Sequence, residues 1–233
     1  MKQALITGGA RGIGFGIAEA MLAAGYKVTV TGLTREEVAA VPRRDNLSAV
    51  TLDVTDDAAV AACIAGLPRM DALVNCAGMV LRDGQEFTIS GFQKVIDVNL
   101  TGTMRMCLAA KPLLDRSGGA IVNIASVWSF FGGPLVPAYT ASKGGVAQLT
   151  KALAVAWAPA IRVNAIAPGW IETDLTKAAQ ADKARSDAIV SRTPFGRWGQ
   201  PDDIGGAAVF LCSEAAGFIT GTVLPVDGGY TAK

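Results

Sequence analysis

Histidine is absent from this sequence. It is the commonest metal ligand, the usual base of serine hydrolases and the most frequent general acid or base near neutral pH. Any proton transfer must therefore use tyrosine, lysine or carboxylate side chains.

Cysteine is also scarce. The four cysteines, Cys63, Cys76, Cys107 and Cys212, are widely spaced, and no two of them form a C-x-x-C pair. This distribution is typical of small buried residues in a reducing compartment, and not of disulfides or a zinc site. We expect no metal.

Strong charge of either sign is missing as well. The formal net charge is +1, and no basic run exceeds two residues. We therefore expect no nucleic-acid partner and no anionic membrane partner. No apolar run approaches the ~20 residues of a membrane span, and the first apolar strand begins almost at Met1, which leaves no room for a signal peptide. These observations predict a cytoplasmic protein.

The chain does contain regularly spaced apolar runs. With 233 residues, 51% of them hydrophobic, it can bury one substantial core, and we predict a single domain over residues 1–233. The runs predict strands at 4–7, 28–31, 49–52, 72–74, 120–124, 161–166 and 222–226. Most are separated by helical patterns, which predicts an α/β fold with a doubly wound, mostly parallel seven-stranded sheet and helices on both faces. The polar stretch 168–200 is a candidate lid.

A glycine-rich turn follows the first strand. Gly8, Gly12 and Gly14 come directly after it, and Ile13 and Ile17 begin one apolar face of a helix. Glycines let the backbone approach a pyrophosphate, while the helix N-terminus offers free N–H groups to the anion. The glycine spacing departs from the common G-x-G-x-x-G arrangement. A tight turn that only packs helix on sheet is the alternative.

Tyr139 and Lys143 stand four residues apart, and Ser126 lies thirteen residues before Tyr139. On a helix the phenol and the ammonium would share one face. Ionising a tyrosine of pKa ~10 at neutral pH costs about 4 kcal/mol, and a cation about 4 Å away at a dielectric of ~20 supplies roughly that much. The pair is a candidate general acid or base. Such pairs also arise by chance on exposed helices.

The remaining unusual residues follow the ends of other predicted strands. Ligands of open α/β sheets bind outside the carboxyl ends of the strands. Asp53 follows the third strand, residues 75–78 the fourth, Ser126 the fifth and residues 168–169 the sixth. Each alone could be an ordinary turn, but together they predict one site at one edge of the sheet.

Taken together, these residues resemble the short-chain dehydrogenase/reductase family over essentially the whole chain. The matching segments are Thr7–Gly14, Asp53–Val54, Asn75–Gly78, Asn99, Ser126, Tyr139 with Lys143, Asn164, Pro168–Gly169 with Thr173, and Asp227–Gly229. One departure is Cys76, where many members carry a second asparagine. The resemblance implies a Rossmann-type fold and hydride transfer between a nicotinamide cofactor and a carbonyl or secondary alcohol.

The resemblance also implies roles for individual residues. Tyr139 would exchange a proton with the substrate oxygen, Ser126 would hydrogen-bond that oxygen, and Lys143 would lower the pKa of the tyrosine and bind the nicotinamide ribose. Asn99 would complete the catalytic set by holding a water that links Lys143 to solvent. Thr173 would hold the carboxamide of the nicotinamide, and Asp53 the adenine amino group. The full cofactor-binding set is Gly8, Arg11, Gly12, Ile13, Gly14, Thr34, Asp53, Val54, Asn75, Ala77, Gly78, Tyr139, Lys143, Pro168, Gly169 and Thr173.

The choice of nucleotide depends on the end of the second strand. An acidic residue about 20 positions past the glycine turn usually holds the ribose hydroxyls of NAD. Gly32 stands there, and Arg11, Thr34 and Arg35 are nearby, which favours NADP(H) slightly over NAD(H). Glu36 and Glu37 are expected in the first turn of the next helix, where carboxylates suit the dipole.

The substrate itself is less well defined. We expect its binding site to be formed by Met79, Val80, residues 127–137, Trp170 and the chain up to Phe195. The pattern is most similar to the 3-oxoacyl reductase branch, but polyol, sugar and cyclic-alcohol dehydrogenases use the same motifs. A nucleotide sensor without activity and an epimerase or dehydratase are further alternatives.

The family usually forms tetramers, pairing through two long helices. Here these are expected over residues 92–114 and 139–157. We therefore expect a homotetramer.

Overall fold

The computed structural model describes residues 1–233 and contains one sheet of seven parallel strands in the order β3-β2-β1-β4-β5-β6-β7. The strands are β1 (Gln3–Thr7), β2 (Lys27–Gly32), β3 (Leu47–Thr51), β4 (Ala72–Asn75), β5 (Ala120–Ile124), β6 (Arg162–Pro168) and β7 (Val223–Val226). The order reverses between β1 and β4, which is where such sheets bind ligands. The predicted α/β doubly wound fold is confirmed.

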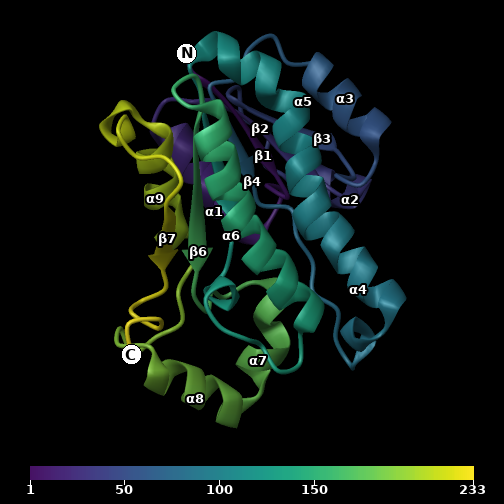
Figure 1. Ribbon diagram of the computed structural model, residues 1–233, viewed down its shortest axis with the longest axis vertical. Coiled ribbons are helices and arrows are strands. Elements are labelled where there is room, and N and C mark those ends of the chain that lie inside the picture. Colours follow the sequence, from purple (N-terminus) through teal and green to yellow (C-terminus); the bar gives the residue numbers. More distant parts are fainter.

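Helices cover both faces of the sheet (Figure 1). One apolar core packs α1 (Gly12–Ala23) and α9 (Asp202–Cys212) against strand residues such as Ile6. The other packs α3 (Asp57–Ala65), α5 (Gly102–Ser117) and α6 (Pro137–Trp157) against residues such as Leu5. Because neighbouring strand residues point to opposite faces and both faces are buried, the strands are continuously apolar.

The strand boundaries match the sequence prediction to within two residues. β3 starts two residues earlier than expected because Leu47 already pairs with Val28. β6 ends two residues later, because Ala167 and Pro168 still pair with β7. Both differences lie at strand ends, where hydrophobicity alone marks the boundary poorly.

The helix expected over residues 92–114 is interrupted. It begins as α4 (Ile89–Ile96), passes through a π-helical segment (Asp97–Thr101) and continues as α5. It starts early because Thr88 caps it, its Oγ1 accepting the backbone N–H of Gly91 at 3.0 Å. The π-helical segment contains Asn99, and such irregular turns are frequent at functional sites.

The predicted lid forms two short helices. The 3₁₀ turn η4 (Asp174–Thr176) leads into α7 (Lys177–Ala181) and α8 (Lys183–Arg192), which lie beyond the carboxyl ends of β6 and β7 (Figure 1). A small core of Ala179, Ile189 and Trp198 holds them together. Its role as a lid stays a prediction. The remaining helix, α2 (Arg35–Ala39), follows β2. No helix is both long and apolar enough to span a membrane.

Candidate active site

Ser126, Tyr139 and Lys143 converge at the carboxyl edge of the sheet. Ser126 lies just after β5, and the other two lie in the first two turns of α6. The Lys143 Nζ stands 5.7 Å from the centre of the Tyr139 ring and donates a hydrogen bond to the Ile124 carbonyl at 2.6 Å. Ser126 and Lys143 are buried, with 6% and 4% of their surface exposed. The structure therefore brings the three predicted groups together.

The electrostatics of the pair differ from the sequence expectation. Burial raises the pKa of Tyr139 to about 12, and the Ser126 hydroxyl acts in the opposite sense. Burial lowers the pKa of Lys143 to about 8. Lys143 was expected to lower the tyrosine pKa, but desolvation is the larger effect for both groups in the free protein. At neutral pH Tyr139 is a protonated phenol, which is the form that can donate a proton.

A short hydrogen-bond chain fixes the loop after β5. The Ser126 Oγ accepts the backbone N–H of Trp128 at 3.2 Å, and the Ser126 backbone N–H donates to the Ser129 Oγ at 3.3 Å. Ser129 in turn donates to the Lys143 carbonyl at 2.7 Å. Ser129 thus ties Ser126 to α6. Ser129 was not among the predicted site residues, although it stands three residues after Ser126, which is the spacing of a capping box.

Asn99 holds neighbouring segments in place. Its Oδ1 accepts the Met79 backbone N–H at 2.8 Å, and its Nδ2 donates to the Met79 carbonyl at 2.9 Å and to the Ser142 Oγ at 3.0 Å. Both Nδ2 hydrogens are thus donated to protein groups, while the Oδ1 keeps a second lone pair. The water that Asn99 would hold stays a prediction. A Cβ on Gly78 would lie 3.4 Å from the Asn99 Oδ1 and 3.7 Å from the Lys143 Nζ, so these three residues adjoin.

The glycine turn has the backbone that a dinucleotide needs. Gly8 and Gly12 adopt φ of +61° and +54°, which favours glycine. A Cβ on Gly8 would lie 2.8 Å from the Ala77 Cα, so β1 and the segment after β4 approach closely. On Gly12 it would meet nothing nearer than Thr173, at 3.4 Å. The N-terminus of α1, with Ile13 and Gly14 in its first turn, lies at this glycine turn. These residues fit a bound pyrophosphate.

The other predicted cofactor residues divide into two groups. Asp53, Val54, Pro168 and Gly169 lie at the carboxyl edge, as predicted. The Asn75 side chain does not face it: it is 3% exposed and donates to the Asn123 Oδ1 at 2.9 Å inside the sheet. The Asn75 side chain therefore joins β4 and β5, and the predicted contact of this residue with the cofactor stays a prediction.

The residues expected to bind the adenosine ribose make contacts with neighbouring protein groups. Arg11 is not free: its Nε donates to the Glu37 Oε1 at 3.0 Å, and its Nη1 lies 3.3 Å from Asp174. Glu37 lies in the first turn of α2, as expected, but it folds back to accept the Leu33 N–H at 2.7 Å. A Cβ on Gly32 would stand 2.9 Å from the Glu37 Cβ. A carboxylate therefore does lie at the end of β2, five residues after Gly32. Thr34 caps α2 by accepting the Glu37 N–H.

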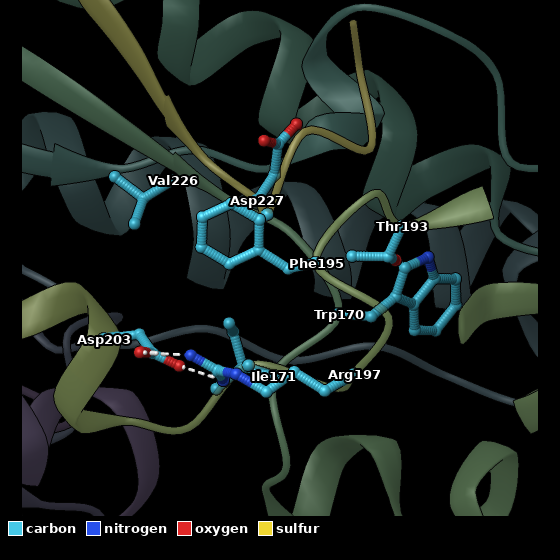
Figure 2. A pocket seen from close by; sticks show the side chains of 10 residues that line it. Trp170, Ile171, Thr193, Phe195, Arg197, Asp203, Val226 and Asp227 are labelled. Atoms are coloured by element: carbon cyan, nitrogen blue, oxygen red, sulfur yellow. Dashed lines mark hydrogen bonds and ion pairs between the residues drawn. The ribbon is translucent and has the colours of Figure 1, made fainter. Parts of the chain in front are cut away.

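Aromatic side chains lie between the loop that follows β5 and the lid. Trp128 packs edge-on against Phe131 at 5.6 Å and against Trp170 at 6.0 Å, as measured between ring centres. Trp170 also lines a cavity of about 160 Å³. In Figure 2, Phe195 and Val226 lie on one side of this cavity and the Arg197–Asp203 ion pair lies on the other. Ser126, Tyr139 and Lys143 do not line this cavity.

Known proteins match this chain over nearly its whole length. A family model described as enoyl-(acyl carrier protein) reductase matches residues 8–231. A 2-dehydro-3-deoxy-D-gluconate 5-dehydrogenase of Bacillus subtilis is 44% identical, the match covering 100% of this chain and 95% of that protein. A D-threitol dehydrogenase of Mycolicibacterium smegmatis is 39% identical over 100% of this chain and 94% of its own length.

Solved structures are similar over the same length. A gluconate 5-dehydrogenase from Burkholderia cenocepacia, in complex with NADP and tartrate, is 38% identical with a TM-score of 0.94, and the match covers 100% of this chain and 96% of that one. A structure from Agrobacterium tumefaciens with bound NADP is 44% identical with a TM-score of 0.90, covering 100% and 97% of the two chains.

Proposed function

Because this chain belongs to the short-chain dehydrogenase/reductase family and is an NAD(P)-dependent oxidoreductase of CH–OH and C=O groups, we propose that it interconverts a sugar acid and its keto form with NADP(H). The observation that carries this proposal is the convergence of Ser126, Tyr139 and Lys143 beside the glycine turn. That full set gives no support to a nucleotide sensor without activity.

The proposed chemistry uses few protein groups. The nicotinamide, when bound, supplies the hydride to the carbonyl carbon. Tyr139 donates its phenolic proton to the carbonyl oxygen, and Ser126 hydrogen-bonds that oxygen as charge develops on it. Lys143 would hold the nicotinamide ribose and Thr173 the carboxamide. The high pKa of Tyr139 keeps the proton available for reduction at neutral pH.

Arg82, a cation in the segment after β4, supports an acidic substrate. Burial and the Ser126 hydroxyl have larger effects on the pKa of Tyr139, but the Arg82 charge also lowers it. Arg82 donates to the Leu175 carbonyl at 2.7 Å and belongs to none of the ion pairs in the structure. Its remaining N–H groups could therefore bind a substrate carboxylate. Several related proteins are named as dehydrogenases of gluconate or its derivatives, which also supports an acidic substrate. Of the substrate classes left open by the sequence, sugars are better supported than 3-oxoacyl compounds.

A neutral polyol is the second candidate, because one relative is a D-threitol dehydrogenase. For the nucleotide, NADP is bound in several similar structures, which supports the choice favoured by the sequence. We also propose a homotetramer that forms through α5 and α6. Four free cysteines fit action in the cytoplasm.

A panel of substrates tests this proposal. NADPH and NADH consumption would be measured with keto sugar acids, neutral ketoses and a 3-oxoester, and NADP⁺ reduction with the matching alcohols. We expect the highest kcat/KM with a sugar acid and NADP(H), and Arg82→Ala should raise KM for acids by about tenfold or more while sparing neutral polyols. Equal loss for both classes, or no turnover of sugar acids, would contradict the proposal.

A further inference from the structure

Glu86 is a buried carboxylate that the proposed chemistry does not use. It lies in the 3₁₀ turn η1 (Gln85–Phe87), and only 1% of its surface is exposed. No ion pair in the structure includes it. Burying a carboxylate without a cation is costly unless hydrogen bonds compensate. Hydrogen bonds to Glu86 must therefore compensate for the burial of its carboxylate.

Two backbone N–H groups supply these hydrogen bonds. The Glu86 Oε2 accepts the backbone N–H of Tyr139 at 2.9 Å, across 53 residues of sequence. Its Oε1 accepts the backbone N–H of Leu81, also at 2.9 Å. The two partners belong to the first turn of α6 and to the loop that carries Arg82. The Glu86 side chain therefore joins the first turn of α6 to the loop that carries Arg82.

The start of α6 lacks a cap of its own. Val136 precedes the helix and makes no side-chain capping bond, and Pro137 occupies its first turn. The unpaired N–H groups of a first turn attract a hydrogen-bond acceptor and a negative charge. Glu86 provides both at Tyr139, from a different part of the chain.

The turn that carries Glu86 is held firmly. Asp83 and Gly84 adopt positive φ of 55° and 75°, which reverses the chain just before it. Thr88 donates to the Gln85 carbonyl at 2.8 Å while it caps α4. Gly91, in that helix, packs directly on the same carbonyl, where no Cβ would fit. Glu86 is thus fixed by α4 and can in turn fix α6.

We propose that Glu86 is a positioning residue that sets the place of Tyr139 and of the Met79–Arg82 loop. This inference rests on the proposed role of Tyr139 as the proton donor. The groups that act on the phenol are Ser126, Cys76 and Arg82, besides Glu86, with Lys143 over the ring. Glu86 raises the pKa of Tyr139 and Arg82 lowers it.

Three variants test the proposal: Glu86→Gln, which removes the charge, Glu86→Asp, which keeps the charge and shortens the reach, and Glu214→Gln, a control at an exposed glutamate. We expect Glu86→Gln to lower kcat by about 10- to 100-fold, with NADPH affinity changed less than about threefold.

Alcohol oxidation needs the phenolate, so its rate rises with pH. Removing the Glu86 charge should move that rise to lower pH by about 0.5 to 1.5 units, the size of one charge acting through a dielectric of ~20 to 40. Glu86→Asp should lower kcat but keep the wild-type profile.

Hydrogen exchange measured by mass spectrometry provides a readout without turnover. In the free enzyme, Glu86→Gln should speed exchange in the peptides that contain Leu81 and Tyr139, and Glu214→Gln should not. If exchange is faster but the protein has no nicotinamide-dependent activity, the proposed function is contradicted while the positioning role is still supported. A Glu86→Gln enzyme with wild-type kcat and exchange, or with reduced kcat and an unmoved pH profile, would overturn the inference.

Discussion

At the scale of single residues, the burial of Lys143 has a consequence for stability. Its pKa is about 8 in the folded protein, below its ordinary value of 10.5. Between these values the unfolded chain binds more protons than the folded one, so stability should rise with pH across the window. Below pH 8 both states are protonated, and the cost of burying the charge is constant.

Lys143→Met should remove this dependence. The free energies of unfolding of both proteins would be measured in urea between pH 7 and pH 10.5. We expect the difference, wild type minus variant, to become more favourable by about 2 kcal/mol as the pH rises, because the slope approaches ~1.4 kcal/mol per unit where Lys143 titrates. Cys107, Cys212 and Tyr26 should shift both curves alike, whereas Cys76, whose pKa burial raises and Lys143 lowers, also contributes to the difference. Parallel curves would show that Lys143 is well hydrated.

The second prediction at the residue scale concerns Glu37. Its carboxylate pairs with Arg11 and lies beside Gly32, where a 2′-phosphate would be repelled. Glu37→Gln should release Arg11 and improve NADPH binding relative to NADH by about tenfold, the effect of one charge-assisted contact. Affinities would be titrated by nucleotide fluorescence at one ionic strength. Glu36→Gln, at the exposed neighbour in the same helical turn, is the control. Equal changes for both nucleotides would contradict the prediction.

At the scale of elements, the sequence predicted the strands and the carboxyl edge well, because buried parallel strands are continuous apolar runs. It predicted α4 and α5 as one helix, because the apolar period continues through the π-helical segment at Asn99. It could not reveal that Glu86 reaches Tyr139 or that Glu37 folds back on Leu33, since both depend on backbone approach. Ser126, Tyr139 and Lys143 were found because their residue types carry the chemistry.

The lid carries the prediction at this scale. Arg185 and Arg192, seven residues apart on α8, lie over the Trp170 ring at 5.6 Å and the Tyr230 ring at 4.3 Å. Each exposed cation–π contact contributes about 0.5 to 1 kcal/mol. Replacing both with methionine should therefore speed proteolysis within residues 174–192 by about five- to thirtyfold. Lys183→Met, on the same helix, should have little effect. An unchanged cleavage rate in the double variant would show that other contacts hold the lid.

At the scale of the whole molecule, exposed apolar residues on the two long helices support assembly. Val155 on α6 is 84% exposed and Leu108 on α5 is 53% exposed. Light scattering should show four 23.9 kDa chains per particle. Val155→Glu should yield smaller species, because a charge would be buried against a partner. Val50→Glu, on the edge strand β3, is the control. A wild-type monomer at micromolar concentration would contradict the proposed assembly.

The central claim is that Tyr139 is the proton donor of a nicotinamide-dependent reductase. It is tested most directly by Tyr139→Phe, assayed for kcat/KM with NADPH and the best keto sugar acid, together with an NADPH titration. The phenylalanine ring keeps the packing and removes only the hydroxyl. We expect kcat/KM to fall by about 10² to 10⁴ while the Kd for NADPH changes less than about threefold. A variant that keeps more than about a tenth of the wild-type kcat/KM would contradict the claim.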